Sequence, residues 1–147
     1  MALRLKEDTR RHVGVFDLAQ GRKVRLSTAD TVDGMACLIE QDEGAVGSSC
    51  LENGFFAQRK VELLVGSQGG PDRVPELHVV GIVAPGIRSA VLVKTDGSVV
   101  ELRLNRDGAF LFESPDADLE ARIYPTKLRL YGPSGKLAGT VTFPPAG

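Results

Sequence analysis

The two cysteines are the residues of this chain whose spacing most directly suggests chemistry. Cys37 lies in an apolar segment, MACLI, and Cys50 follows 13 positions later, after a stretch rich in Gly and Ser. Such a stretch can fold the chain back on itself, so we expect a hairpin closed by a Cys37–Cys50 disulfide. A bridge across a loop of this length stabilises a fold by about 3 kcal/mol through chain entropy. Two free buried thiols in a cytosolic protein are the alternative.

The other residues with metal-binding or redox chemistry do not extend this pair into a known motif. The chain has no C-x-x-C pair and no base close to either cysteine that would lower a thiol pKa. His12 and His78 are far apart in the sequence and do not show structural zinc spacing. We therefore predict no metal ligand and no bound cofactor.

His78 is the histidine placed where burial is expected. It lies in an apolar run, Leu77–Ala84, which predicts a packed or hydrogen-bonded core residue. A role as a general base with Glu76 is disfavoured, because neighbours on a strand face opposite sides. No G-x-S-x-G surrounds Ser48 or Ser49, and no H-E-x-x-H or P-loop occurs. The sequence thus indicates no catalytic residue.

Acidic residues dominate the segment around the cysteines. No Lys or Arg occurs from Leu26 to Gln58, whereas six carboxylates do. The loop between the cysteines, with Glu40, Asp42 and Glu43, is a candidate interaction site that would favour a basic ligand or a divalent ion. A solvated hairpin tip is the alternative.

These residues must be positioned by β-strands, because apolar residues recur with a period of two along much of the chain. The alternating segments on either side of Asp96-Gly97 predict a hairpin, and Asp-Gly favours a two-residue type I′ turn. The run Leu77–Ala84 is apolar at nearly every position, which predicts a central strand covered on both faces.

Counting from Lys23, about nine short strands separated by turn signals predict an all-β fold. We expect a single β-sandwich domain over residues 23–147, with immunoglobulin-like or Greek-key connections and a disulfide-closed hairpin. Residues 1–22 fit neither the helical nor the strand period, so they predict an N-terminal arm that could include a short helix.

Composition is that of an ordinary soluble domain. Hydrophobic residues make up 42% and charged residues 25% of the 147 positions, which suits one packed core. The net charge of −1 gives no reason to expect nucleic acid or an anionic membrane as a partner. No run of 18 apolar residues occurs, so we expect no membrane span, although an anchor upstream of this chain remains compatible.

A family resemblance follows from the order of several segments: ACLIE, GSSC, VVGIVAPGIRSAVLV, KTDGSVVELRL, DGAFLFE and LRLYGPSGKL. Over roughly residues 24–143, this order resembles β-domains of secreted or membrane-anchored proteins common in actinobacteria, whose functions are not characterised. The resemblance implies a hairpin disulfide and a bend followed by a strand at VAPGIRSAVLV. It carries over no catalytic residue.

Two classes of function are compatible with these features. The first is a non-catalytic extracellular or cell-envelope domain that has a structural role or binds a protein or cell-wall component through loops or a strand edge. It would be secreted or face the outside of the cell envelope. The alternative is a hydrolase whose site is assembled from scattered residues.

Overall fold

The computed structural model describes residues 4–43, 45–68 and 76–143. Over these ranges the protein is all-β, which confirms the predicted fold class. The chain forms β1 (Leu5–Asp17), a 3-10 turn (Ala19–Gly21), β2 (Lys23–Thr31), β3 (Ala36–Asp42), β4 (Ala45–Leu51), β5 (Val61–Gln68), β6 (Glu76–Val83), β7 (Ser89–Lys94), β8 (Val99–Leu102), β9 (Ala109–Glu113), α1 (Asp116–Glu120), β10 (Pro125–Tyr131) and β11 (Leu137–Thr142).

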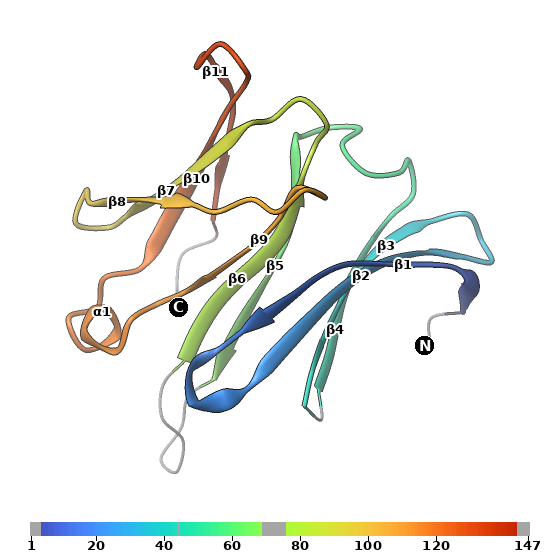
Figure 1. The fold of residues 1–147 in the computed structure, drawn as a ribbon, viewed down its shortest axis with the longest axis horizontal. Helices are drawn as coiled ribbons and strands as arrows, with labels where there is room; N and C mark the ends of the chain where they lie inside the picture. Colours follow the sequence, from blue (N-terminus) through green and yellow to red (C-terminus); the bar gives the residue numbers. More distant parts are fainter. Residues whose placement is uncertain (1–3, 44, 69–75, 144–147) are drawn as a thin grey trace.

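The strands form three antiparallel sheets. Sheet A has the order β1-β2-β3-β4, sheet B the order β5-β6-β9, and sheet C the order β11-β10-β7-β8. Figure 1 shows sheet B in the middle, with sheet A and sheet C on either side of it. The sandwich therefore has three layers, and two separate apolar cores fill the spaces between them.

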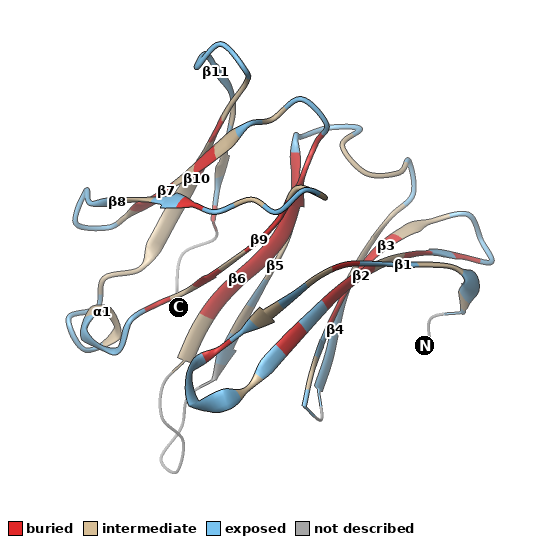
Figure 2. Ribbon diagram, viewed as in Figure 1, coloured by how far each residue is buried: buried red, intermediate tan, exposed pale blue. Residues whose placement is uncertain are grey.

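The predicted central strand is β6. Because side chains alternate along a strand, Val79 packs into the core shared with sheet C, and Val80 packs into the core shared with sheet A. Burial along β6 is nearly continuous, whereas the hairpin tips of sheets A and C are exposed (Figure 2). Gly81 lets β6 approach its neighbours closely, since a Cβ there would lie 3.0 Å from Phe110. An apolar run without alternation thus reflects burial on both faces.

The hairpin at Asp96-Gly97 is present, but its turn is not type I′. Thr95 and Asp96 form the centre of a turn in which the Gly97 amide donates to the Lys94 carbonyl at 3.0 Å. Only Gly97 has a positive φ, of 84°, as in a three-residue loop that ends in a glycine bulge. The same hydrogen-bond pattern closes the loops that end at Gly34, Gly108 and Gly135.

The N-terminal arm expected over residues 1–22 instead contains β1, a 13-residue strand at the edge of sheet A. Two register shifts interrupt its pairing with β2, between Lys6 and Arg11 and between His12 and Gly14. Each shift changes which residues face the core, so the period of two is lost in the sequence although the strand continues. The expected short helix is not formed in the described part of this arm, where only a 3-10 turn at Ala19–Gly21 follows β1.

The predicted disulfide hairpin is confirmed. Cys37 of β3 lies directly opposite Cys50 of β4, with their Cα atoms 4.0 Å apart, and the two sulfur atoms are bonded. The bridge packs with Ala29 and Ile39 in a third, small apolar cluster on sheet A.

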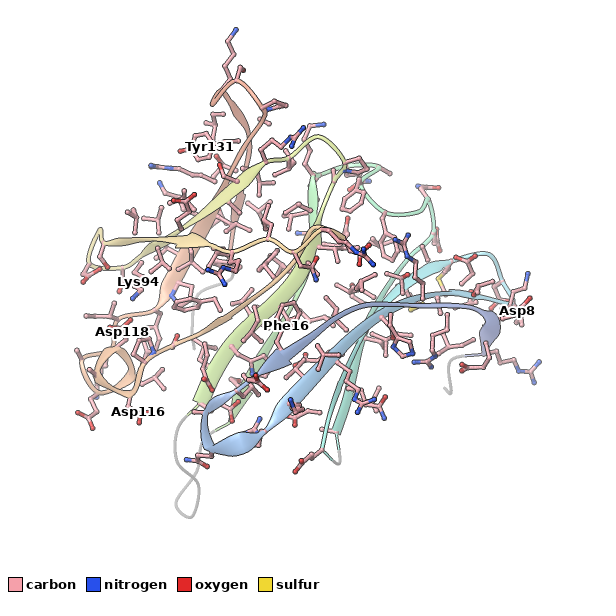
Figure 3. All side chains as sticks on the ribbon, in the orientation of Figure 1. Asp8, Phe16, Lys94, Asp116, Asp118 and Tyr131 are labelled. Atoms are coloured by element: carbon pink, nitrogen blue, oxygen red, sulfur yellow. A yellow bond between two sulfur atoms is a disulfide. The ribbon has the colours of Figure 1, made fainter. Side chains whose placement is uncertain are left out.

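The short helix α1 is attached to sheet C by an ion pair. Lys94 Nζ donates to Asp118 Oδ2 at 2.6 Å and also lies over the Phe112 ring. Figure 3 shows the labelled side chains of Lys94 and Asp118 next to each other beside this helix. Within the described ranges, no helix is long and apolar enough to cross a membrane.

Candidate ligand-binding site

A cavity of about 610 Å³ lies where three segments distant in the sequence meet. Its walls come from the loop after β6 (84–88), the β8–β9 loop (104–108) and Arg11 of β1, with Pro133 at one side. This volume is within the range of pockets that hold small molecules.

The cavity is lined by three arginines and one carboxylate. Arg11 Nη2 donates to Asp107 Oδ1 at 2.8 Å, which neutralises that carboxylate. Arg88 and Arg106 are exposed, and neither forms an ion pair with any described residue. Two guanidinium groups with free N–H donors on one cavity suit a carboxylate or phosphate group, which accepts hydrogen bonds from both N–H groups of a fork.

Asn105 holds the β8–β9 loop in the shape that presents Arg106. Its Oδ1 accepts hydrogen bonds from the amides of Asp107 and Ala109, both at 2.9 Å. Its Nδ2 donates to the Val13 carbonyl of β1 at 2.8 Å. One side chain therefore closes the loop and ties it to sheet A, so this wall of the cavity is already formed without a ligand.

The wall formed by the loop after β6 is also constrained. The Ile87 amide donates to the Ala84 carbonyl at 3.1 Å, which closes a turn with Pro85 and Gly86 at its centre. Gly86 has a φ of 94°, the conformation that the third position of a type II turn requires. The Arg88 amide then donates to the Tyr131 carbonyl at 2.8 Å and fixes the base of the arginine against β10.

The buried histidine is part of a separate, charged network between sheets A and B. His78 Nε2 is hydrogen-bonded to Glu40, and His78 Nδ1 lies 3.3 Å from Glu76 Oε1. Arg22 in turn donates to Glu76, and to Asp42 Oδ2 at 2.6 Å. The hydrogen bond to Glu76 is the main cause that raises the pKa of Arg22, with burial opposing it and Asp42 adding to it.

The expectation that Glu76 and His78 face opposite sides is wrong. The two residues are two positions apart on β6, so their side chains share a face. Room for the ring comes from Gly66, its cross-strand partner on β5, where a Cβ would lie only 2.7 Å from His78 Nε2. The histidine is thus an interior residue hydrogen-bonded to Glu40, as predicted, and Glu76 is a charged neighbour on the same face of the strand.

Burial by itself would lower the pKa of His78. The hydrogen bond to Glu40 and the negative charges of Glu40 and Glu76 outweigh that effect, so the pKa lies above its ordinary value of 6.5. The network therefore favours a protonated imidazolium between two carboxylates.

Two of the three carboxylates of the predicted acidic interaction loop are paired within this network. The side chain of Glu40 is only 10% exposed and is bonded to His78, and Asp42 is paired with Arg22. Glu43 remains exposed. The segment itself contains no Lys or Arg, but tertiary contacts bring Arg22 and His78 to its carboxylates from outside the segment.

The arginine-lined cavity was not foreseen. Arg11 lies on β1, whereas Arg88 and Arg106 lie in the β6–β7 and β8–β9 loops. Only the turn signals APG and NRDG beside the two loop arginines could have drawn attention to those positions. Neither His12 nor His78 lines this cavity.

Comparison with protein-family models, curated proteins and solved structures found no match for this chain.

Proposed function

We propose that this protein is a non-catalytic binding domain that works outside the cytoplasm and holds an anionic group of its ligand in the arginine-lined cavity. The observation that carries the proposal is the meeting of Arg11, Arg88 and Arg106 around one cavity with a single carboxylate. Because the chain as a whole has a net charge of −1, this local excess of positive charge is not a consequence of composition. Its walls are closed turns, which lowers the ordering cost of binding.

The disulfide supports an extracellular setting. Disulfides persist in oxidising compartments and are rare in the cytosol, where thiols are kept reduced. Cys37 and Cys50 are bonded, and the bridge is part of a buried cluster in sheet A. A secreted protein, or one on the outer face of a cell envelope, with a protein or cell-wall component as partner, fits this chemistry.

A hydrolase remains the alternative, and the position of His78 argues against it. A general base must reach the proton that it abstracts from a substrate or a water. The His78 side chain is 7% exposed and its Nε2 is already bonded to Glu40. This arrangement suits a structural link between sheets better than proton transfer to a ligand.

The proposal is tested by removing the two unpaired guanidinium groups. We expect Arg88→Gln with Arg106→Gln to weaken binding of phosphate or succinate by about tenfold or more, measured by isothermal titration calorimetry at low salt. The matched control is Arg25→Gln with Arg103→Gln, which makes the same change in net charge at exposed positions outside the cavity. Equal loss in both double variants, or no binding to the unmodified protein, would contradict the proposed site.

A further inference from the structure

A second cavity, with the opposite charge, lies beside the disulfide. It has a volume of about 330 Å³ and is lined by the segment that joins β4 to β5 together with the start of β5. Its polar lining residues are Glu52, Asn53, Gln58, Arg59 and Glu62.

Glu62 is the feature of this cavity that points to a ligand. Its side chain is only 5% exposed, and its Oε1 accepts a hydrogen bond from the Phe56 amide at 3.3 Å. Its Oε2 is buried without a hydrogen-bond partner in the part of the chain that the structure describes. A buried carboxylate oxygen without a donor is costly, so such an atom on a cavity wall is expected to have a donor for at least part of the time.

The nearest cation of the chain does not supply that donor. Arg59 Nη2 lies 3.7 Å from Glu62 Oε2, which is longer than a hydrogen bond, and the Arg59 side chain is 46% exposed. Only the arginine end of this pair is exposed to solvent. Arg59 therefore reduces the local negative charge without satisfying the oxygen, and it can move away.

The cavity wall is held in place before any ligand arrives. Gly54 and Phe56 both have positive φ, of 80° and 67°, and Phe56 is a side chain that rarely adopts this conformation. The rings of Phe55 and Phe56 pack against the core between sheets A and B. The Cys50 end of the disulfide lines the cavity itself. Costly backbone conformations of this kind cluster at functional sites.

The oxygen atoms on the wall suit an organic cation better than a metal ion. Glu52 and Glu62 provide two carboxylates against one arginine, and Asn53 and Gln58 can add amide oxygens. Over the described residues, no group of three or more His, Cys, Asp or Glu side chains could hold a metal. A primary ammonium group has three N–H donors, matches an acceptor-rich wall and requires no fixed coordination geometry.

We propose that this cavity binds a primary ammonium group, with Glu62 Oε2 as its principal acceptor and Arg59 as an internal competitor. The site is independent of the arginine-lined cavity, since the two share no lining residue.

The test is a titration with propylammonium chloride, followed by NMR. The reporter is the Phe56 amide, because it donates to the same carboxylate that would receive the ammonium. We expect this amide resonance to shift and saturate with propylammonium. We expect no such shift with propanol, which lacks the charge, and a smaller one with tetramethylammonium, which lacks N–H donors.

Two variants change the affinity in opposite directions. Glu62→Gln keeps the acceptor for the Phe56 amide but removes the charge, so we expect propylammonium binding to weaken about tenfold or more. Arg59→Gln removes the competing cation, and we expect binding to tighten by about two- to fivefold. The matched control is Glu101→Gln, an exposed carboxylate on β8 outside the cavity, which should leave the affinity unchanged.

Several outcomes would overturn the proposal. Saturation by calcium chloride but not by propylammonium would make the site a metal site. An equal response to propanol would make it an apolar pocket, and unchanged binding in Glu62→Gln would remove the carboxylate from it. Since none of these tests involves phosphate or the arginine variants, failure here is distinguishable from failure of the proposed function.

Discussion

At the residue scale, the side chain with the most unusual surroundings is His78. Its two ring nitrogens face Glu40 of sheet A and Glu76 of its own strand, and Gly66 leaves room for the ring. Arg22 balances part of the negative charge by binding Glu76. The imidazole therefore links two sheets through charge as well as through packing.

This arrangement predicts a pH-dependent contribution to stability. Because the pKa of His78 is raised in the folded protein, its protonated form stabilises the fold fully below the unfolded pKa of 6.5. That contribution is lost as the pH rises through the higher folded value. We expect the free energy of unfolding of the unmodified protein to fall more between about pH 6 and pH 9 than that of His78→Gln, measured by urea denaturation.

The control for this comparison is His12→Gln, because His12 is exposed on β1. The pH dependence should be the same in that variant as in the unmodified protein. An NMR titration that places the pKa of His78 at or below 6.5 would refute the account of its two carboxylate partners.

At the element scale, one kind of tight loop recurs through the molecule. The loops ending at Gly34, Gly97, Gly108 and Gly135 all place a glycine with positive φ after a turn closed by the same pair of backbone hydrogen bonds. Such loops fix the register of the strands that they join. The loop at Gly108 differs in that a side chain, Asn105, also connects it to another sheet.

Removal of this connection should affect both stability and ligand binding. We expect Asn105→Ala to lower the free energy of unfolding by about 1–3 kcal/mol, because two amides and the Val13 carbonyl lose their partner. It should also weaken phosphate binding in the arginine-lined cavity, since Arg106 follows Asn105 directly. Thermal unfolding and calorimetry measure the two effects.

Ser98→Ala is a suitable comparison, because Ser98 Oγ bonds only within its own turn, to Asp96. We expect little change in binding from it. Phosphate affinity that is unaltered in Asn105→Ala would show that the loop does not need this side chain to present Arg106.

At the scale of the whole molecule, sheet B belongs to both cores. Neighbouring residues of β6 project into different cores, so neither core can form without this strand. A domain with two cores that share a sheet should unfold as one cooperative unit rather than layer by layer.

Substitutions on the two faces of β6 test this cooperativity. We expect Val79→Ala and Val80→Ala each to lower the free energy of unfolding by about 1–3 kcal/mol. The tyrosine signal reports on sheet C, because Tyr131 ends β10 and Tyr124 directly precedes it, whereas far-UV circular dichroism reports on all strands. In both variants the two signals should change at the same denaturant concentration. A tyrosine transition in Val80→Ala that lags behind the loss of strand signal would indicate that sheet A unfolds on its own.

Local patterns in the sequence were sufficient for much of this fold. The all-β class, the strand segments after Lys23, the hairpin closed by Cys37 and Cys50, and the doubly covered strand β6 could all be predicted. They could be predicted because alternation, turn residues and short loop closure depend on residues close together in the chain.

Other features depended on contacts between distant parts of the chain. The bulges of β1 hid a strand from periodicity, and the stacking of three sheets decided which carboxylates are buried. Glu40 pairs with a histidine 38 positions away, and Arg11 pairs with an aspartate 96 positions away. By itself the sequence determined the strands after Lys23, whereas only the tertiary structure placed Arg11 beside Asp107 and His78 beside Glu40, because side chains distant in sequence meet only when sheets pack.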